Sequence, residues 1–205
     1  MLTTKLGLRQ CLTDACLFIH DTKKIYLLLY VDDLLLLTET QEHSDCFFTE
    51  LGSQVLLKHT GTLDANTTVR FLGRQLTRRG DNILVRPLHN FIDTLLQLYN
   101  LVDCRPLTTT GTTLVKRPTD GDEQLSPATR KTYRTAVGKL MWLSNIRADI
   151  TFATKELARG MSSPTQEHLA SLKHLLRYIA GTKNSGLMLK PSHVLPLPSS
   201  TKNYT

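Results

Sequence analysis

Two short apolar runs on either side of a pair of aspartates stand out in the first third of the chain. Residues 25–37 read IYLLLYVDDLLLL, with Tyr30 and Val31 before the aspartates and four leucines after them. Short aliphatic runs separated by turn-forming residues predict two buried strands joined by a tight turn. Aspartate favours such turns because its side chain accepts hydrogen bonds from nearby backbone N–H groups. The pattern therefore predicts a hairpin with Asp32 and Asp33 at its tip.

The residues next to this hairpin predict one more strand and a helix. Residues 15–19 are apolar and predict a strand that precedes the hairpin. Thr38 and Gln41 have the spacing of a capping box, which predicts the start of a short amphipathic helix that Gly52 ends. Residues 58–68 are polar and predict a loop.

A second hairpin is predicted after this loop. The tripeptide FLG at residues 71–73 leads into it, residues 75–79 and 83–85 form its arms, and residues 79–82 form its turn. Pro87 is expected to be the first residue of the next helix, because a fixed φ and a missing N–H suit that position.

The last third of the chain is predicted to be helical. Pro127 follows a serine and predicts the start of one helix, and Asp149 is expected to cap a shorter one. Ser163 is expected to cap a third helix, with Gln166 completing its capping box and Gly181 ending it. Apolar residues repeat at helical spacing in each segment, which predicts a shared core.

These elements predict an α+β fold whose chain is organised in five parts. The two hairpins and the first helix occupy residues 1–86, and a single helix occupies residues 87–102. Residues 103–125 are rich in Thr, Pro, Gly and Asp and predict a linker. Residues 126–190 form a basic helical region, and residues 191–205 are expected to be a disordered tail.

The positive charge of the chain is concentrated in its helical third. Ten lysines and arginines stand against three acidic residues between Pro127 and Lys183, and this stretch carries the whole net charge of +7. Such an asymmetry favours a polyanionic partner, nucleic acid before a membrane surface. A solvated basic surface without a partner remains the alternative.

The cysteine pattern and the apolar runs indicate where in the cell the protein is located. Cys11, Cys16, Cys46 and Cys104 fit neither a disulfide framework nor a paired zinc motif, and we expect reduced thiols. No signal segment opens the sequence, and the apolar run at residues 25–37 is too short and too charged to span a bilayer. We expect an intracellular protein, cytoplasmic or nuclear, with no membrane partner.

The adjacent carboxylates of Asp32 and Asp33 are the candidate chemistry. Two neighbouring anions repel each other, and a bound cation relieves that repulsion. Mg²⁺ binds carboxylate oxygens together with substrate phosphates, so the pair predicts metal-assisted phosphoryl or nucleotidyl transfer. The alternative is that the two aspartates form only a turn, as this dipeptide usually does.

Several motifs together resemble one family. They are GLRQ (7–10), DACLF (14–18), YVDD (30–33), FLG (71–73), YRTAVGKLMWL (133–143), RADITFA (147–153), SPTQEHLASLKHLLRYIAGT (163–182) and GL (186–187). In this order they resemble the C-terminal part of the reverse transcriptase of copia-type LTR retrotransposons, over about residues 7–189. Each motif is weak by itself, but the ordered set is specific.

The resemblance implies a polymerase fragment. Residues 1–86 would be a partial palm, residues 87–102 a thumb-like helix, and residues 126–190 a thumb and connection region. Asp32 and Asp33 would be two of three palm carboxylates that hold two Mg²⁺ ions, with Mn²⁺ as a possible substitute, for nucleotidyl transfer. By the same resemblance, the incoming nucleotide and the primer end would lie over Tyr30 and Val31.

The resemblance also implies nucleic-acid contacts and partners. The expected partners are an RNA or DNA template–primer, a dNTP, and the remainder of the Pol polyprotein, including the fingers, the upstream palm and ribonuclease H. The primer grip would contain Phe71, Leu72 and Gly73, and the nucleic-acid backbone contacts would come from Arg74, Lys173 and Arg177.

The sequence also departs from the family pattern. The third carboxylate of the family lies on a strand upstream of YVDD, and neither Asp14 nor Asp21 has that setting; Ala148 stands where the family usually has proline. We therefore expect an RNA-directed DNA polymerase by descent that is poor or inactive as an isolated chain. The alternatives are a non-catalytic nucleic-acid-binding remnant and a domesticated protein whose basic helices bind another protein.

Overall fold

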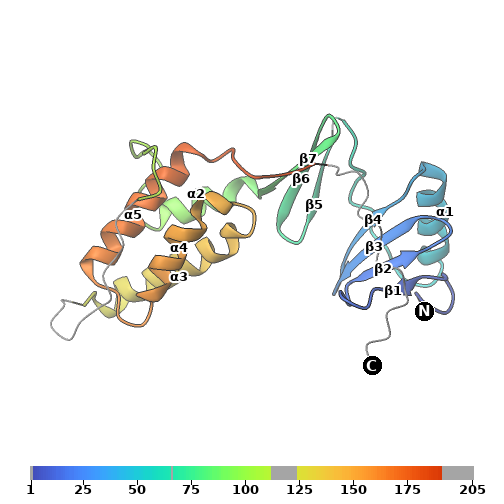
Figure 1. The fold of residues 1–205 in the computed structure, drawn as a ribbon, viewed down its shortest axis with the longest axis horizontal. Helices are drawn as coiled ribbons and strands as arrows, with labels where there is room; N and C mark the ends of the chain where they lie inside the picture. Colours follow the sequence, from blue (N-terminus) through green and yellow to red (C-terminus); the bar gives the residue numbers. More distant parts are fainter. Residues whose placement is uncertain (1, 66, 112–123, 191–205) are drawn as a thin grey trace, which may run out of the picture. The chain divides into compact units, whose positions relative to one another are not determined.

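The fold is α+β, as the sequence predicts. The computed structural model describes residues 2–65, 67–111 and 124–190. Within these residues it contains two antiparallel sheets and five α-helices (Figure 1). No helix in this described part of the chain is long and apolar enough to cross a membrane. The contacts divide the chain into two compact units, which are described separately.

Unit 1 comprises Met1–Leu63 and Thr67–Gly73 and is built on the first sheet. The strand order β1-β2-β3-β4 follows the sequence, so each strand pairs antiparallel with the next. Figure 1 shows α1 packed against one face of this sheet. The elements are β1 (Arg9–Gln10), β2 (Leu17–His20), β3 (Ile25–Tyr30), β4 (Asp33–Leu37) and α1 (Gln41–Gly52).

The core of unit 1 lies between α1 and the sheet. Ile25 and Leu27 are two residues apart on β3, so they share a face, and they pack with Phe47 and Leu51 of α1. All four side chains are buried. The predicted hairpin is confirmed, but β4 is not buried as predicted, since Leu34 and Leu36 are half-buried and Leu37 is exposed.

The helix start differs from the predicted capping box. Thr40 is the N-cap of α1, and its hydroxyl accepts a hydrogen bond from the backbone N–H of His43 at 3.3 Å. The hydroxyl of Thr38 instead donates to the carbonyl of Thr40 at 2.9 Å. The prediction from Thr38 and Gln41 is wrong because Thr40 stands directly before the helix and offers the same hydroxyl chemistry.

In unit 2, β7 pairs antiparallel with β6 on one side and with β8 on the other. These strands are β6 (Arg74–Arg79), β7 (Asn82–Pro87) and β8 (Leu187–Leu189), and β5 (Thr68–Phe71) belongs to unit 1. The predicted hairpin of residues 75–85 is confirmed as β6 and β7, and Gly80 at φ +60° opens its two-residue turn. A Cβ at Gly186 would collide with the carbonyl oxygen of Val85, so glycine lets β8 approach β7.

The predicted start of the helix after β7 is wrong. Pro87 is the last residue of β7, where it pairs with Arg74, and Leu88 is the N-cap of α2 (His89–Gln97). Proline suits this position because a residue that ends a strand needs no further ladder hydrogen bond.

Unit 2 comprises Asp64–Asn66 and Arg74–Thr205. Besides β6, β7, β8 and α2, it contains α3 (Pro127–Ser144), the 3₁₀ helix η1 (Ala148–Ile150), α4 (Thr151–Arg159) and α5 (Gln166–Gly181). The helices share one core of buried aliphatic side chains. The predicted stripes of α3 and α5 are confirmed, since Val137, Leu140, Leu172 and Ile179 are all fully buried.

Among the helices of unit 2, two predicted caps are wrong and one is correct. Ser126 caps α3 by accepting a hydrogen bond from the N–H of Thr129 at 3.3 Å, as predicted. Thr165, not Ser163, caps α5, and its hydroxyl lies 2.8 Å from Nδ1 of His168. Asp149 caps nothing: it lies within η1 and pairs with the preceding arginine.

The predicted linker is only partly described. Residues 105–109 lie along α5, because Arg177 donates from Nε to the carbonyl of Arg105 at 2.9 Å and Leu107 N–H donates to the carbonyl of Arg177 at 3.3 Å. Residues 112–123, and the tail expected at residues 191–205, lie outside the described residues. The contacts group the β6–β7 hairpin with unit 2, whereas the sequence placed it with residues 1–86. The assignment of these parts to palm, thumb and connection stays a prediction.

A buried arginine connects η1 to the end of α5. The side chain of Arg147 is 1% exposed, and its guanidinium donates two hydrogen bonds to the carboxylate of Asp149, at 2.9 and 2.7 Å. It donates two more to Thr182, at 2.9 Å to the carbonyl and 2.8 Å to the hydroxyl. Tyr178 donates to the same carboxylate at 2.8 Å. The charge is therefore compensated by hydrogen bonds and by the carboxyl end of α5.

Replacement of Arg147 by Met is expected to destabilise unit 2 by about 3 kcal/mol, because Asp149 keeps only the hydrogen bond from Tyr178 and the carbonyl of Thr182 loses its side-chain donor. The free energy of unfolding is measured by urea unfolding, followed by the fluorescence of Trp142. The control is Lys183→Met, which breaks a pair with Asp93 whose side chains are 37% and 44% exposed. Lys183→Met should lower the free energy of unfolding by at most about 1 kcal/mol. Equal effects of the two substitutions would contradict the role given to Arg147.

The same contacts predict a pH dependence. The hydrogen bonds from Arg147 hold the pKa of Asp149 below its ordinary value of 3.8, with a further contribution from Tyr178. A carboxyl whose pKa is lower in the folded state stabilises the fold above its unfolded pKa and loses that contribution as the pH falls through the folded pKa. The stability difference between the wild type and Asp149→Asn should therefore be full at pH 6 and shrink below about pH 4. A difference that stays constant from pH 6 to pH 3 would contradict this.

Candidate active-site hairpin and nucleic-acid contacts

The YVDD segment forms the tight turn between β3 and β4. Tyr30 pairs with Asp33, so Val31 and Asp32 are the two loop residues. Val31 has φ +55°, in the left-handed region that β-branched residues rarely adopt. Glycine is the usual residue at the first position of such a turn. The hairpin therefore holds backbone strain at the residue directly before the aspartates.

The four side chains of this turn are exposed. Tyr30 is 54% exposed and Val31 86%, and both aspartates are in the exposed class. Among the described residues, neither Asp32 nor Asp33 forms an ion pair or a side-chain hydrogen bond. The structure thus presents two adjacent carboxylates with unused acceptor oxygens at the turn of the hairpin.

The two carboxylates fit part of a Mg²⁺ site. Mg²⁺ takes oxygen ligands and is often held by one or two carboxylates plus phosphates and water, which matches the unpaired oxygens of Asp32 and Asp33. Across the described residues, no group of three His, Cys, Asp or Glu side chains is placed to hold a metal. An ion bound by Asp32 and Asp33 would need further ligands beyond these two carboxylates.

The predicted primer-grip residues form a second tight turn. Phe71 ends β5, and Leu72 and Gly73 are the two loop residues, with φ values of +49° and +71°. Positive φ at both positions is the geometry of a type I′ hairpin turn. Leu72 and Gly73 therefore form the turn that follows β5, whereas the sequence predicts that the tripeptide only leads into a hairpin.

The predicted backbone-contacting cations have different surroundings. Lys173 is exposed on α5. Arg177 is half-buried, and its Nε is used by the carbonyl of Arg105. The guanidinium of Arg74 lies 5.6 Å from the centre of the Trp142 ring. Arg177 thus uses one of its donors on another segment, and a joint contact of Lys173 and Arg177 with one phosphate backbone stays a prediction.

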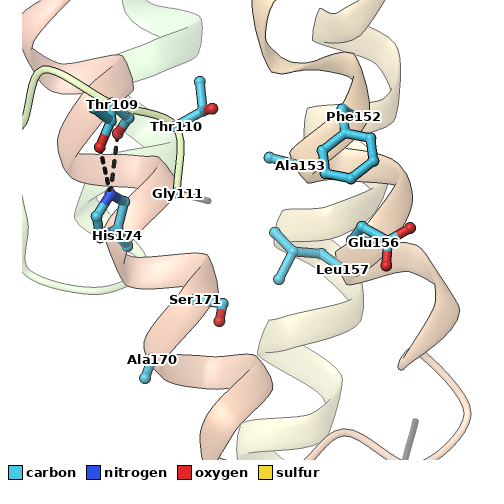
Figure 2. Close-up of a pocket in the computed structure, with 10 residues that line it drawn as sticks. All are labelled: Thr109, Thr110, Gly111, Phe152, Ala153, Glu156, Leu157, Ala170, Ser171 and His174. Atoms are coloured by element: carbon cyan, nitrogen blue, oxygen red, sulfur yellow. Dashed lines mark hydrogen bonds between the residues drawn. The ribbon is translucent and has the colours of Figure 1, made fainter. Parts of the chain in front are cut away.

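A groove between α4 and α5 was not predicted from the sequence (Figure 2). It has a volume of about 280 Å³ and is lined by Thr109, Thr110, Gly111, Phe152, Ala153, Glu156, Leu157, Ala170, Ser171 and His174. Nε2 of His174 bonds to Thr109, and the buried Glu156 carboxylate accepts from Arg159 at 3.0 and 3.1 Å. These polar groups already have structural partners, and isolated Glu and His residues gave no sequence signal for a site.

Known proteins with similar sequences identify the family. The retrovirus-related Pol polyproteins from transposons RE1 and RE2 of Arabidopsis thaliana are 31% and 30% identical over 94% and 93% of the chain. The retrovirus-related Pol polyprotein from transposon TNT 1-94 of Nicotiana tabacum is 27% identical over 83%. The chain belongs to the copia-type Pol polyproteins.

This copia-type chain corresponds to a small part of those relatives. It spans about 13% of the length of each of these three polyproteins. No protein-family profile matches it, and no solved structure matches it. The family assignment thus rests on sequence similarity, and the predicted motif order agrees with it.

The strain at Val31 makes a measurable prediction for the copia-type hairpin. Val31→Gly should stabilise unit 1 by about 1 kcal/mol, because glycine adopts positive φ without the steric cost of a Cβ. Val31→Ala, which keeps the Cβ, is the matched control and should gain less. Hydrogen exchange of the β3 and β4 amides measures the local stability. A Val31→Gly protein that exchanges as fast as the wild type would show that the turn is not strained.

Proposed function

We propose that this chain is part of an RNA-directed DNA polymerase and carries its YVDD hairpin and a nucleic-acid-binding helical region. The observation that carries the proposal is the pair of exposed, unpaired carboxylates on a two-residue turn in a chain of the copia-type Pol family. Asp32 and Asp33 would hold Mg²⁺. When bound, this ion would polarise a nucleotide phosphate and lower the pKa of a primer hydroxyl.

The protein residues have simpler roles in this proposal. Asp32 and Asp33 supply negative oxygens at a fixed position, since a closed hairpin limits their movement. Tyr30 and Val31 present exposed surface beside them, on which a nucleotide and a primer end would lie. The RNA or DNA template–primer would be held through its phosphates by the basic residues of unit 2.

A primer-extension assay with an RNA template, a DNA primer, dNTPs and Mg²⁺ tests the proposal. We expect template–primer binding without extension by the chain alone, because the resemblance implies a third carboxylate and none joins Asp32 and Asp33 among the described residues. Adding a polypeptide with the upstream polymerase segment of a related Pol polyprotein should produce extension. Asp32→Asn plus Asp33→Asn should then reduce the rate roughly a thousandfold or more.

Asp81→Asn is the matched control for this assay. Asp81 is also exposed and is also the second residue of a two-residue hairpin turn, between β6 and β7. At saturating template–primer its replacement should leave the extension rate within about twofold, since this carboxylate lies on a different hairpin from Asp32 and Asp33. Extension that survives in the double variant would overturn the assignment of Asp32 and Asp33. Extension by the chain alone would show that another group replaces the third carboxylate.

The non-catalytic alternative makes a different prediction for the same assay. A nucleic-acid-binding remnant would bind the template–primer and show no extension even with the upstream segment present. The observation that favours this second function is the basic surface of unit 2, which is independent of the aspartate pair.

A further inference from the structure

The β6–β7 hairpin and α3 carry an unusual excess of positive charge. Together they hold eight lysines and arginines and one acidic residue, Asp81. The eight are Arg74, Arg78, Arg79, Arg86, Arg130, Lys131, Arg134 and Lys139. None of the five ion pairs found among the described residues involves one of these eight. This surface of unit 2 therefore keeps its charge.

The remaining ion pairs of unit 2 lie elsewhere. Asp93 of α2 pairs with Lys183, Glu156 of α4 pairs with Arg159, and Arg147 is fully compensated by its own cluster. The ion pairs of unit 2 thus compensate Arg147, Arg159 and Lys183, and none of them involves a cation of β6, β7 or α3. An uncompensated group of this size is what a polyanion requires.

Two of the eight cations converge on a pair of aromatic rings. Phe91 of α2 and Trp142 of α3 have ring centres 4.6 Å apart. The guanidinium of Arg74 lies 5.6 Å from the centre of the Trp142 ring, and Nζ of Lys139 lies 5.3 Å from the centre of the Phe91 ring. We call these four residues the Trp142 cluster.

The Trp142 cluster restrains its two cations without neutralising them. A ring face attracts a cation but takes none of its N–H donors. The rings therefore limit the rotamers of two long side chains, which lowers the entropy lost when either binds an anion. In addition, Nε of Arg74 is buried and has no hydrogen-bond partner in the part of the chain that the structure describes.

We propose that Arg74 and Lys139, positioned by Phe91 and Trp142, bind the phosphate backbone of a nucleic acid. This inference rests on the proposed function and adds to it the location of the site that binds the phosphate backbone. Arg74 was expected to contact the backbone, but Lys139 and the aromatic pair carried no sequence signal. The cluster replaces the α5 pair of Lys173 and Arg177 as the main contact, since Arg177 already donates to Arg105.

The salt dependence of binding tests the proposal in the full chain. A labelled RNA–DNA template–primer is titrated by fluorescence anisotropy between 50 and 300 mM KCl. The slope of log K against log[KCl] should fall in magnitude by about 0.9 in Arg74→Gln and in Lys139→Gln, and by about twice that in the double variant. At 100 mM KCl each single variant should bind roughly five- to tenfold more weakly.

Matched variants separate charge from structure. Lys58→Gln removes an exposed cation from unit 1, outside the basic residues of unit 2, and should leave the slope unchanged. Lys173→Gln tests the contact on α5 that the resemblance implies. Arg74→Lys keeps the charge and should retain the wild-type slope. Trp142→Leu keeps both cations, so it should weaken binding while the slope changes little. Thermal unfolding shows whether each variant is folded.

The fluorescence of Trp142 gives a second readout at the cluster. It is the only tryptophan in the chain, so its emission reports this surface alone. Template–primer binding should change the emission and reduce quenching by acrylamide. Unchanged quenching in a saturated complex would overturn the proposal.

The outcomes distinguish this inference from the proposed function. Salt-sensitive binding that persists unchanged in the Arg74 and Lys139 variants overturns this inference alone. A reduced slope in Lys173→Gln with an unchanged slope in those variants would place the phosphate contact on α5. Salt-insensitive binding, or no binding, by the wild type overturns both. Binding of polyglutamate as tight as that of the template–primer would indicate an acidic protein partner and overturn the nucleic-acid assignment.

Discussion

The helical unit depends on one fully buried guanidinium. Arg147 bonds to Asp149 beside it in sequence and to Thr182 at the end of α5, so it fixes the start of α4 against a helix that ends more than thirty residues later. A charge with 1% of its side chain exposed is tolerated only because four hydrogen bonds compensate it. The surrounding leucines can then pack in one arrangement.

The same unit separates cations by their role. Arg147, Arg159 and Lys183 are paired with carboxylates and serve the fold. The cations of β6, β7 and α3 have no such partners, and Arg74 and Lys139 are held by ring faces. Rings restrain a cation and leave its hydrogen-bond donors available. This difference in partner chemistry distinguishes a structural charge from one that can bind an anion.

The two tight turns of unit 1 reach similar geometry with different sequences. Val31 and Leu72 are both non-glycine residues at positive φ, and each is the first residue of a two-residue loop. Glycine would relieve the strain in both. At the YVDD turn the strained residue directly precedes the two aspartates, so the backbone there is fixed where the proposed chemistry needs a fixed position.

The sequence alone determined the elements whose signal is local. The β3–β4 hairpin, the cap at Ser126 and the leucine stripe of α5 follow from period and cap chemistry, and the ordered motifs gave the family. Contacts distant in sequence decided the rest. Asp149 pairs with Arg147 and is not a helix cap. Arg177 donates to the carbonyl of Arg105, and Lys139 lies over the ring of Phe91. Such roles depend on which groups packing brings within a few ångströms, and local sequence patterns do not encode that.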